Sequence, residues 1–284
     1  MTFHVALASY SFHGLVGKGQ LTLLGYLELL SSRYQVHWAD IWTGLLPPES
    51  LEADYLKLVR GWLDERQIGL ANLCVDGPYL WHSDPDVRKQ HEQLMLRYLD
   101  AARILGARSV RIDFGGDDQA MPEDAFEAIV ARYRAYCRIC QDNGMMIGPE
   151  NHWGWDRDPD NLRRVRDAVD HPAYGHLYHV RDGTKPDGAR ILEVCLPSLM
   201  HTHFSADAVT WCKPLLRRLA ASGYAGACSI EHHSGQHELA RVAWQLGCLQ
   251  SQIAELEAES PDAADDEGFI ARSVRQGQPQ EVRS

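Results

Sequence analysis

The sequence predicts an α/β protein in which eight parallel strands and their connecting helices form a (β/α)8 barrel. Eight short apolar segments alternate with longer segments whose apolar residues recur at helical spacing. The 284 residues are enough for one such barrel. No glycine-rich phosphate loop follows the first segment, where the sequence is ASYSFHGLVGKGQ. A doubly wound sheet with a second domain is therefore the weaker alternative.

The predicted strands are short and apolar. They lie at residues 3–12, 36–42, 68–76, 107–115, 144–151, 174–180, 199–205 and 226–233. The predicted helices are longer and amphipathic, at residues 21–33, 50–66, 86–106, 121–144, 158–169, 208–223 and 237–259. The sixth unit has no predicted helix, because residues 181–198 contain RDGTKPDG and favour a loop.

Residue types at the helix ends support these boundaries. Gly106 is a good C-terminal stop for the third helix. Asp158 and Pro159 are typical of a helix start. Pro214 indicates an interruption early in the helix at 208–223.

The chain is expected to form one barrel domain at residues 1–258. The last helix carries an apolar stripe that should cover the barrel, made of Leu239, Val242, Leu246, Leu249, Ile253 and Leu256. Residues 259–284 are polar and lack periodicity, so we expect a tail that is disordered or packs on a neighbouring subunit.

Composition excludes several classes of function. The net charge of −11 argues against nucleic acid or an anionic membrane as the main partner. No apolar run is long enough to span a membrane, and the start MTFHVALASYSF lacks the basic region of a signal peptide. The seven cysteines are odd in number and not spaced like a secreted disulfide framework, so we expect a cytoplasmic protein.

Chemistry in a (β/α)8 barrel sits at the carboxyl ends of the strands. The polar and aromatic residues at these ends include Tyr10, His13, Asp40, Trp42, Asp76, Tyr79, His82, Arg111, Asp113, Glu150, His152, His179, His201, His203, Glu231, His232 and His233. Glu150, His179, His203 and Glu231 follow four successive strands. Two carboxylates and two imidazoles at one mouth would suit a divalent transition-metal ion.

Longer stretches around these residues resemble a known family. PENHWGWDRDPDNLRRVRDAV, LMHTHFSADAV, GYAGACSIEHH and HSDPDVRKQHEQLMLRYLDAARILGARSVRI are similar to the sugar phosphate isomerase/epimerase family of xylose isomerase-like TIM barrels. The resemblance covers about residues 3 to 255 and implies a bound Mn²⁺, Mg²⁺, Co²⁺ or Zn²⁺. Carried onto this chain, the implied ligands are Glu150, His179, His203 and Glu231. The resemblance also implies a homo-oligomer.

The sequence departs from the family in two places. The sixth-strand ligand is commonly Asp in the family, whereas YGHLYHVRD offers His179, with Asp182 as the alternative. A histidine there favours Mn, the ion we expect most, or Co, Fe or Zn, over Mg. The lysine expected after His203 is absent, which argues against a phosphorylated substrate.

The predicted function is a metal-dependent sugar isomerase or epimerase acting on a keto-sugar. Glu150 and Glu231 are the predicted catalytic pair, which would move a proton next to the carbonyl through a metal-stabilised enediolate. A lyase or dehydratase acting on a 3-keto-glycoside or a sugar acid is the alternative. The residues expected to bind this small carbohydrate are His152, Trp155, Arg111, His82 and His201.

Two further hypotheses are weaker. An endonuclease of the same superfamily would need a cluster of three ions and a basic groove, which the acidic composition disfavours. A barrel that has lost catalysis and serves only for binding would be expected to lose part of the ligand quartet, which is complete here.

Overall fold

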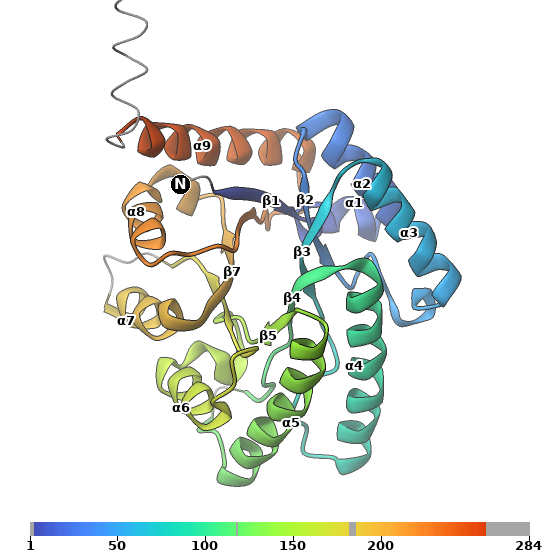
Figure 1. Cartoon of the computed structure of the whole chain (residues 1–284), viewed down its shortest axis with the longest axis vertical. Coiled ribbons are helices and arrows are strands. Elements are labelled where there is room, and N and C mark those ends of the chain that lie inside the picture. Colours follow the sequence, from blue (N-terminus) through green and yellow to red (C-terminus); the bar gives the residue numbers. More distant parts are fainter. Residues whose placement is uncertain (1–2, 118, 182–185, 260–284) are drawn as a thin grey trace, which may run out of the picture.

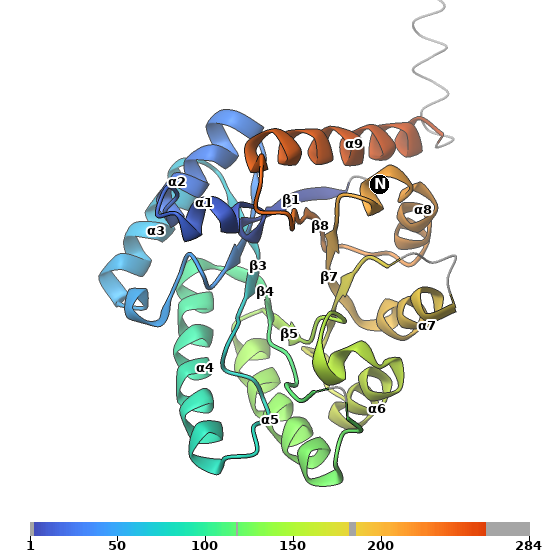
Figure 2. The same cartoon turned by 180° about the vertical axis from the view of Figure 1, so that it is seen from behind.

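In a computed structural model, which describes residues 3–117, 119–181 and 186–259, helices surround one sheet of eight parallel strands (Figures 1 and 2). The strands are β1 (His4–Ala8), β2 (Trp38–Trp42), β3 (Gly69–Cys74), β4 (Ala107–Arg111), β5 (Met146–Gly148), β6 (His176–His179), β7 (Leu199–Phe204) and β8 (Ala227–Ile230). The α-helices are α1 (His13–Gly17), α2 (Leu23–Glu28), α3 (Ala53–Glu65), α4 (Pro85–Leu105), α5 (Glu123–Asp142), α6 (Pro159–Val169), α7 (Pro186–Cys195), α8 (Lys213–Ala221) and α9 (Glu238–Ala258).

The sheet is a nearly closed barrel. Its strand order is β5-β4-β3-β2-β1-β8-β7-β6, so β5 and β6 are the two ends that must meet. Isolated bridges join Ile147 to Tyr174 and Glu150 to Leu177 across this seam. The predicted (β/α)8 barrel is thus confirmed, and the doubly wound alternative is wrong.

Glycine allows the two chains to approach at the seam between β5 and β6. A Cβ atom on Gly148 would lie 1.6 Å from the carbonyl oxygen of Gly175. The Gly175 N–H also donates to the Ile147 carbonyl at 3.0 Å, which holds the backbones at this separation. No larger side chain fits at position 148 unless the seam opens.

The helices begin and end where local chemistry favours it. Asp84 caps α4 by accepting from the Asp86 N–H at 2.8 Å, and Gly106 ends that helix with a φ of 73°. Asp158 caps α6 in the same way, accepting from the Asp160 N–H at 2.9 Å.

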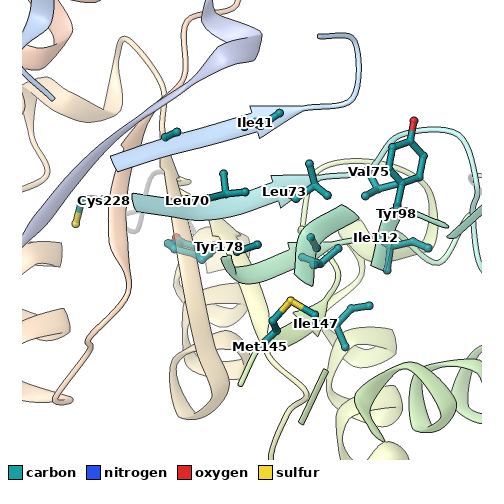
Figure 3. Packing of buried hydrophobic residues seen from close by; sticks show 14 of the residues in the cluster. Ile41, Leu70, Leu73, Val75, Tyr98, Ile112, Met145, Ile147, Tyr178 and Cys228 are labelled. Atoms are coloured by element: carbon teal, nitrogen blue, oxygen red, sulfur yellow. The ribbon is translucent and has the colours of Figure 1, made fainter. Parts of the chain in front are cut away.

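Most of the apolar core lies between the strands and the helices. Ile41, Leu73 and Ile147 belong to the largest cluster of buried apolar side chains (Figure 3). Ala8 and Asp40 are paired in register, and both line a cavity at the barrel mouth. Because side chains alternate along a strand, the interior therefore receives small and polar residues while neighbours such as Ile41 point outward.

The last helix covers one side of the barrel (Figure 1). The apolar stripe predicts this, except for Leu239, which is exposed. Its buried residues include Val242, Leu246, Leu249 and Ile253. Apart from Glu259, the predicted tail lies outside the described residues. Within the described part of the chain, no helix has the length and apolar character needed to cross a membrane.

Several predicted elements differ from the structure; the fourth strand, for example, ends at Arg111 rather than at residue 115. Three differences have a local cause. The loop predicted at 181–198 contains α7 and a 3-10 turn, and Pro186 stands at the start of that helix, where a proline is tolerated. The first strand ends at Ala8 rather than at residue 12, because the chain turns there into a 3-10 turn and α1. Pro214 does not interrupt a helix; it lies in the first turn of α8.

Candidate active site

Four side chains from neighbouring strand ends meet at the barrel mouth. Glu150 follows β5, His179 ends β6, His203 belongs to β7 and Glu231 follows β8. One potential ligand atom from each lies within 4.8 Å of those of the other three. The fold thus brings together the quartet that the sequence singles out. The alternative sixth-strand ligand, Asp182, lies outside the described residues.

Both carboxylates of the quartet face the same two ring nitrogens. Glu150 Oε1 lies 3.0 Å from His179 Nδ1 and 2.9 Å from His203 Nδ1. Glu231 Oε2 lies 3.4 Å from His179 Nδ1 and 3.3 Å from His203 Nδ1. The four donor atoms therefore enclose one small volume, as the ligands of a single ion would.

The electrostatics of the quartet favour a bound cation. Burial would raise the pKa of both carboxylates, but nearby histidines lower it. His152 and then His203 lower the pKa of Glu150. His203 has the largest lowering effect on the pKa of Glu231. Burial would lower the pKa of His203, but Glu231, Glu150 and Asp40 raise it well above 6.5. A proton on His203 thus supplies positive charge to the buried carboxylates. A divalent ion would satisfy the same demand, so the residues present fit a metal.

A second group of possible ligands lies deeper in the barrel. Asp40 Oδ2 is 2.9 Å from His201 Nε2 and 2.8 Å from His203 Nε2, and all three residues are buried. Asp40, His201 and His203 could therefore also hold an ion. Among the described residues, these two groups are the ones with metal-ligand geometry, and they share His203.

Arg111 is buried beside the quartet and is surrounded by carboxylates. Its Nη1 lies 2.7 Å from Asp76 Oδ1 and 2.8 Å from Asp113 Oδ2, and its Nε lies 3.3 Å from Glu150 Oε2. Its charge is therefore already balanced by protein groups. This geometry orients Glu150 and leaves Arg111 poorly suited to capture an anionic substrate.

The quartet opens onto a cavity of about 170 Å³. Its lining residues are Ala8, Tyr10, Asp40, Trp42, Cys74, Asp76, Arg111, Glu150, His152, His179, Glu231 and His233. A second, outer cavity of about 970 Å³ shares His152, His179 and His233 with it. The site thus has a small inner chamber and a larger outer one.

One wall of the inner cavity is aromatic. The rings of Tyr10 and Trp42 meet edge to face with centroids 5.0 Å apart, and Trp42 Nε1 donates to Asp76 Oδ2. A Cβ atom on Gly44 would lie 2.2 Å from the Trp42 ring, so glycine at position 44 makes room for it. Such a wall suits the apolar face of a sugar.

The structure separates the predicted substrate residues. Arg111 and His152 line the inner cavity, whereas His201 is buried against Asp40. Trp155 packs in a loop, where its Nε1 donates to the Gln119 carbonyl at 2.9 Å. His82 is exposed before α4 and accepts from the Asp84 N–H. Contact between substrate and His82, Trp155 or His201 stays a prediction.

The predicted substrate set omits part of the cavity wall. Four further residues of the wall stand at strand ends in the sequence: Tyr10, Trp42, Asp76 and His233. The sequence does not single them out as substrate contacts, because aromatic and polar residues at such positions often serve only loop packing. Cys74 carries no signal in the sequence, since a buried cysteine is ordinary core.

Residues 38–252 match the family described as Xylose isomerase-like TIM barrel. The chain belongs to that family. The resemblance inferred from PENH, the His-x-His strand and the terminal SIE is thereby confirmed. No curated protein matches the sequence.

Solved structures share this xylose isomerase-like barrel at low identity. A D-allulose 3-epimerase from Methylomonas sp. is 14% identical with a TM-score of 0.68, over 90% of this chain and 100% of that one. The 3-keto-D-glucoside 4-epimerase from E. coli is 14% identical with a TM-score of 0.66, over 87% and 100%. The probable 3-DHS dehydratase from Bacillus anthracis is 12% identical with a TM-score of 0.65, over 88% and 99%. These similarities establish the fold.

Proposed function

We propose that this xylose isomerase-like barrel is a divalent-metal-dependent isomerase or epimerase of keto-sugars. The observation that carries the proposal is the convergence of Glu150 and Glu231 on the Nδ1 atoms of His179 and His203. The adjoining cavity of about 170 Å³, with its aromatic wall, suits a small carbohydrate. The two sugar epimerases with the same fold are consistent with this substrate class.

The quartet of Glu150, His179, His203 and Glu231 would hold one divalent ion. Its two imidazole nitrogens favour Mn²⁺, Co²⁺, Fe²⁺ or Zn²⁺ over Mg²⁺, and we propose Mn²⁺ first. When bound, such an ion polarises the carbonyl of the sugar and stabilises the enediolate that forms when the adjacent proton leaves.

The two carboxylates move the proton in this proposal. Their lowered pKa values keep both ionised at neutral pH, which is the form that accepts a proton. Arg111 Nε lies 3.3 Å from Oε2 of Glu150 and places a positive charge beside that carboxylate. One carboxylate removes the proton next to the carbonyl and later releases it to solvent, while the other takes up a proton from solvent and delivers it to the planar intermediate. Return on the opposite face gives an epimer, and return at the neighbouring carbon gives an isomer.

One observation favours a lyase or dehydratase as the second candidate. The outer cavity of about 970 Å³ adjoins the inner one, so a substituent larger than a single sugar has room. A 3-keto-glycoside could place its sugar in the inner cavity and its aglycone in the outer one. The same proton abstraction would then expel the substituent β to the carbonyl.

Metal content is the first test. Mass spectrometry on the full chain, purified without chelator, should find about one Mn, Co, Fe or Zn per chain, as expected for one four-donor site. The double variant Glu150→Gln with Glu231→Gln should lose it. Glu65→Gln removes an exposed carboxylate on α3 and should keep the metal. A wild type that holds no metal even after reconstitution would contradict the proposal and favour a binding barrel.

The reaction class is tested with the metal-loaded protein and a panel of keto-sugars in deuterated water. An isomerase or epimerase should incorporate deuterium into a product of unchanged composition. A lyase should release the β-substituent instead, which would support the second candidate.

A further inference from the structure

A chain of buried polar side chains runs from the quartet into the barrel interior. His203 Nε2 lies 2.8 Å from Asp40 Oδ2, and Asn72 Nδ2 donates to Asp40 Oδ1 at 3.1 Å. The Ser109 hydroxyl lies 2.8 Å from Asn72 Oδ1. All four residues are at most 2% exposed. Apolar layers normally fill a barrel of this kind, so a buried carboxylate here calls for a reason.

The two ring nitrogens of His203 have different surroundings. Nδ1 faces the carboxylates of Glu150 and Glu231, at 2.9 and 3.3 Å. Among the carboxylates of the described residues, Nε2 faces Asp40 alone, at 2.8 Å. A histidine binds a metal through the nitrogen without a proton and keeps its proton on the other one. For His203 to bind through Nδ1, its proton must therefore reside on Nε2.

We propose that Asp40 is a positioning residue for the metal centre. It accepts the hydrogen bond from Nε2–H of His203, which selects the tautomer whose Nδ1 is the ligand and fixes the angle of the ring. The inference rests on the proposed function, because it takes His203 as a ligand. Hydrogen bonds of this kind, donated by a metal-binding histidine to a carboxylate, raise metal affinity.

The surroundings of Asp40 hold it in this role. Asn72 Oδ1 faces the Ser109 hydroxyl, which turns the Asn72 amide nitrogen toward Asp40 Oδ1. His201 Nε2 lies 2.9 Å from the same Oδ2 that His203 contacts. Both oxygens of Asp40 therefore face donors. An amide in its place would turn an NH₂ group toward one of those donors, so Asp40→Asn should disturb the arrangement without changing its size.

The same atoms could instead bind a second ion among Asp40, His201 and His203. A neutral imidazole offers one nitrogen lone pair to a metal, and in the proposed centre the quartet uses Nδ1 of His203. A second ion would require His203 to bind metals through both nitrogens. We therefore expect one ion per chain.

The test is the Kd for Mn²⁺, measured by calorimetry on the chelator-stripped full chain. Asp40→Asn should weaken Mn²⁺ binding by roughly 10- to 100-fold. Asp64→Asn is the control, because it removes the same charge from the surface of α3, where Asp64 pairs with Arg60. It should keep a Kd close to that of the wild type.

Several outcomes would overturn the inference: an unchanged Kd in Asp40→Asn, an equal weakening in both variants, or two ions per wild-type chain. If Asp40→Asn does not fold, ¹⁵N NMR of the Zn²⁺-loaded wild type decides, with the His203 signals assigned through His203→Gln. A proton on Nε2 supports the inference, and a proton on Nδ1 overturns it. A wild type that binds no Mn²⁺ would instead refute the proposed function.

Discussion

Arg111 Nε lies 3.3 Å from Glu150 Oε2, and both side chains are buried in the wall of the inner cavity. The guanidinium also contacts Asp76 and Asp113, so one cation faces three carboxylates. The sequence suggests Arg111 as a substrate contact. Its position suggests a different task, which is to hold Glu150 and neutralise the acidic side of the cavity.

Replacing Arg111 by Met should therefore destabilise the fold. Removing one partner of a buried ion pair leaves the other charge uncompensated, which costs about 3–5 kcal/mol. Urea unfolding at neutral pH measures the change. Arg103→Met removes an exposed pair with Asp100 on α4 and should cost less than about 1 kcal/mol. Equal stability of the Arg111 variant and the wild type would show that the buried network contributes nothing to folding.

The metal-free protein should lose stability as the pH rises above neutrality. The folded-state pKa of His203 is raised, so its contribution is complete below the unfolded value of 6.5 and is lost as the pH rises through the folded value. The lowered pKa values of Glu150 and Glu231 have the opposite effect: their contribution is present above 4.5 and is lost as the pH falls through the folded values.

Urea unfolding in chelator from about pH 6 to about pH 9 tests this pH dependence. The free energy of unfolding should decline across this range in the wild type and in His82→Gln, which alters an exposed histidine. His203→Gln should lack that decline. A parallel decline in His203→Gln would assign the effect to another group.

Trp42 should govern substrate affinity in the proposed reaction. Trp42→Ala removes one half of the aromatic wall and should raise KM roughly 10-fold, which corresponds to about 1.4 kcal/mol, with a smaller change in kcat. Trp42→Phe keeps an aromatic face and should restore most of the affinity. Steady-state kinetics on the active keto-sugar provide the measurement, and an unchanged KM in Trp42→Ala would place the substrate elsewhere.

Gly148→Ala should be among the most damaging small substitutions. The added Cβ would lie 1.6 Å from the Gly175 carbonyl oxygen, so the seam must open, at a cost of about 3 kcal/mol or more. Gly61→Ala is the matched control. It lies inside α3 with no atom within 4 Å of the new methyl group, and should stabilise the protein by about 0.5–1 kcal/mol. Thermal unfolding of both variants is the measurement. A Tm of Gly148→Ala equal to that of the wild type would show that the seam tolerates the methyl group.

The barrel and the quartet could be predicted because both depend on local patterns. Apolar segments of strand length identify β1 to β8, and one carboxylate or imidazole at each of four strand ends identifies the quartet. α7 is not predicted because its first three residues, Pro186, Asp187 and Gly188, are turn-forming types whose signals outweigh a short helical pattern.

The rest of the site depends on contacts between distant segments. Asp40 is separated from His203 by 163 positions, and only the closed sheet brings them within hydrogen-bond distance. Trp155 could not be distinguished from Trp42 by sequence, since both stand near the carboxyl end of a strand. Their different surroundings arise from Gly44, which admits the Trp42 ring beside the cavity, and from Gln119, which binds the Trp155 indole.

The seam between β5 and β6 has a mechanical consequence. Glu150 stands on one side of this seam and His179 on the other. An ion bound by both residues would cross-link β5 and β6, which are joined by isolated bridges rather than by a continuous ladder of strand pairing. Metal binding and closure of the barrel between β5 and β6 would then be thermodynamically linked. A substitution that weakens the contact between these two strands should therefore also weaken metal affinity.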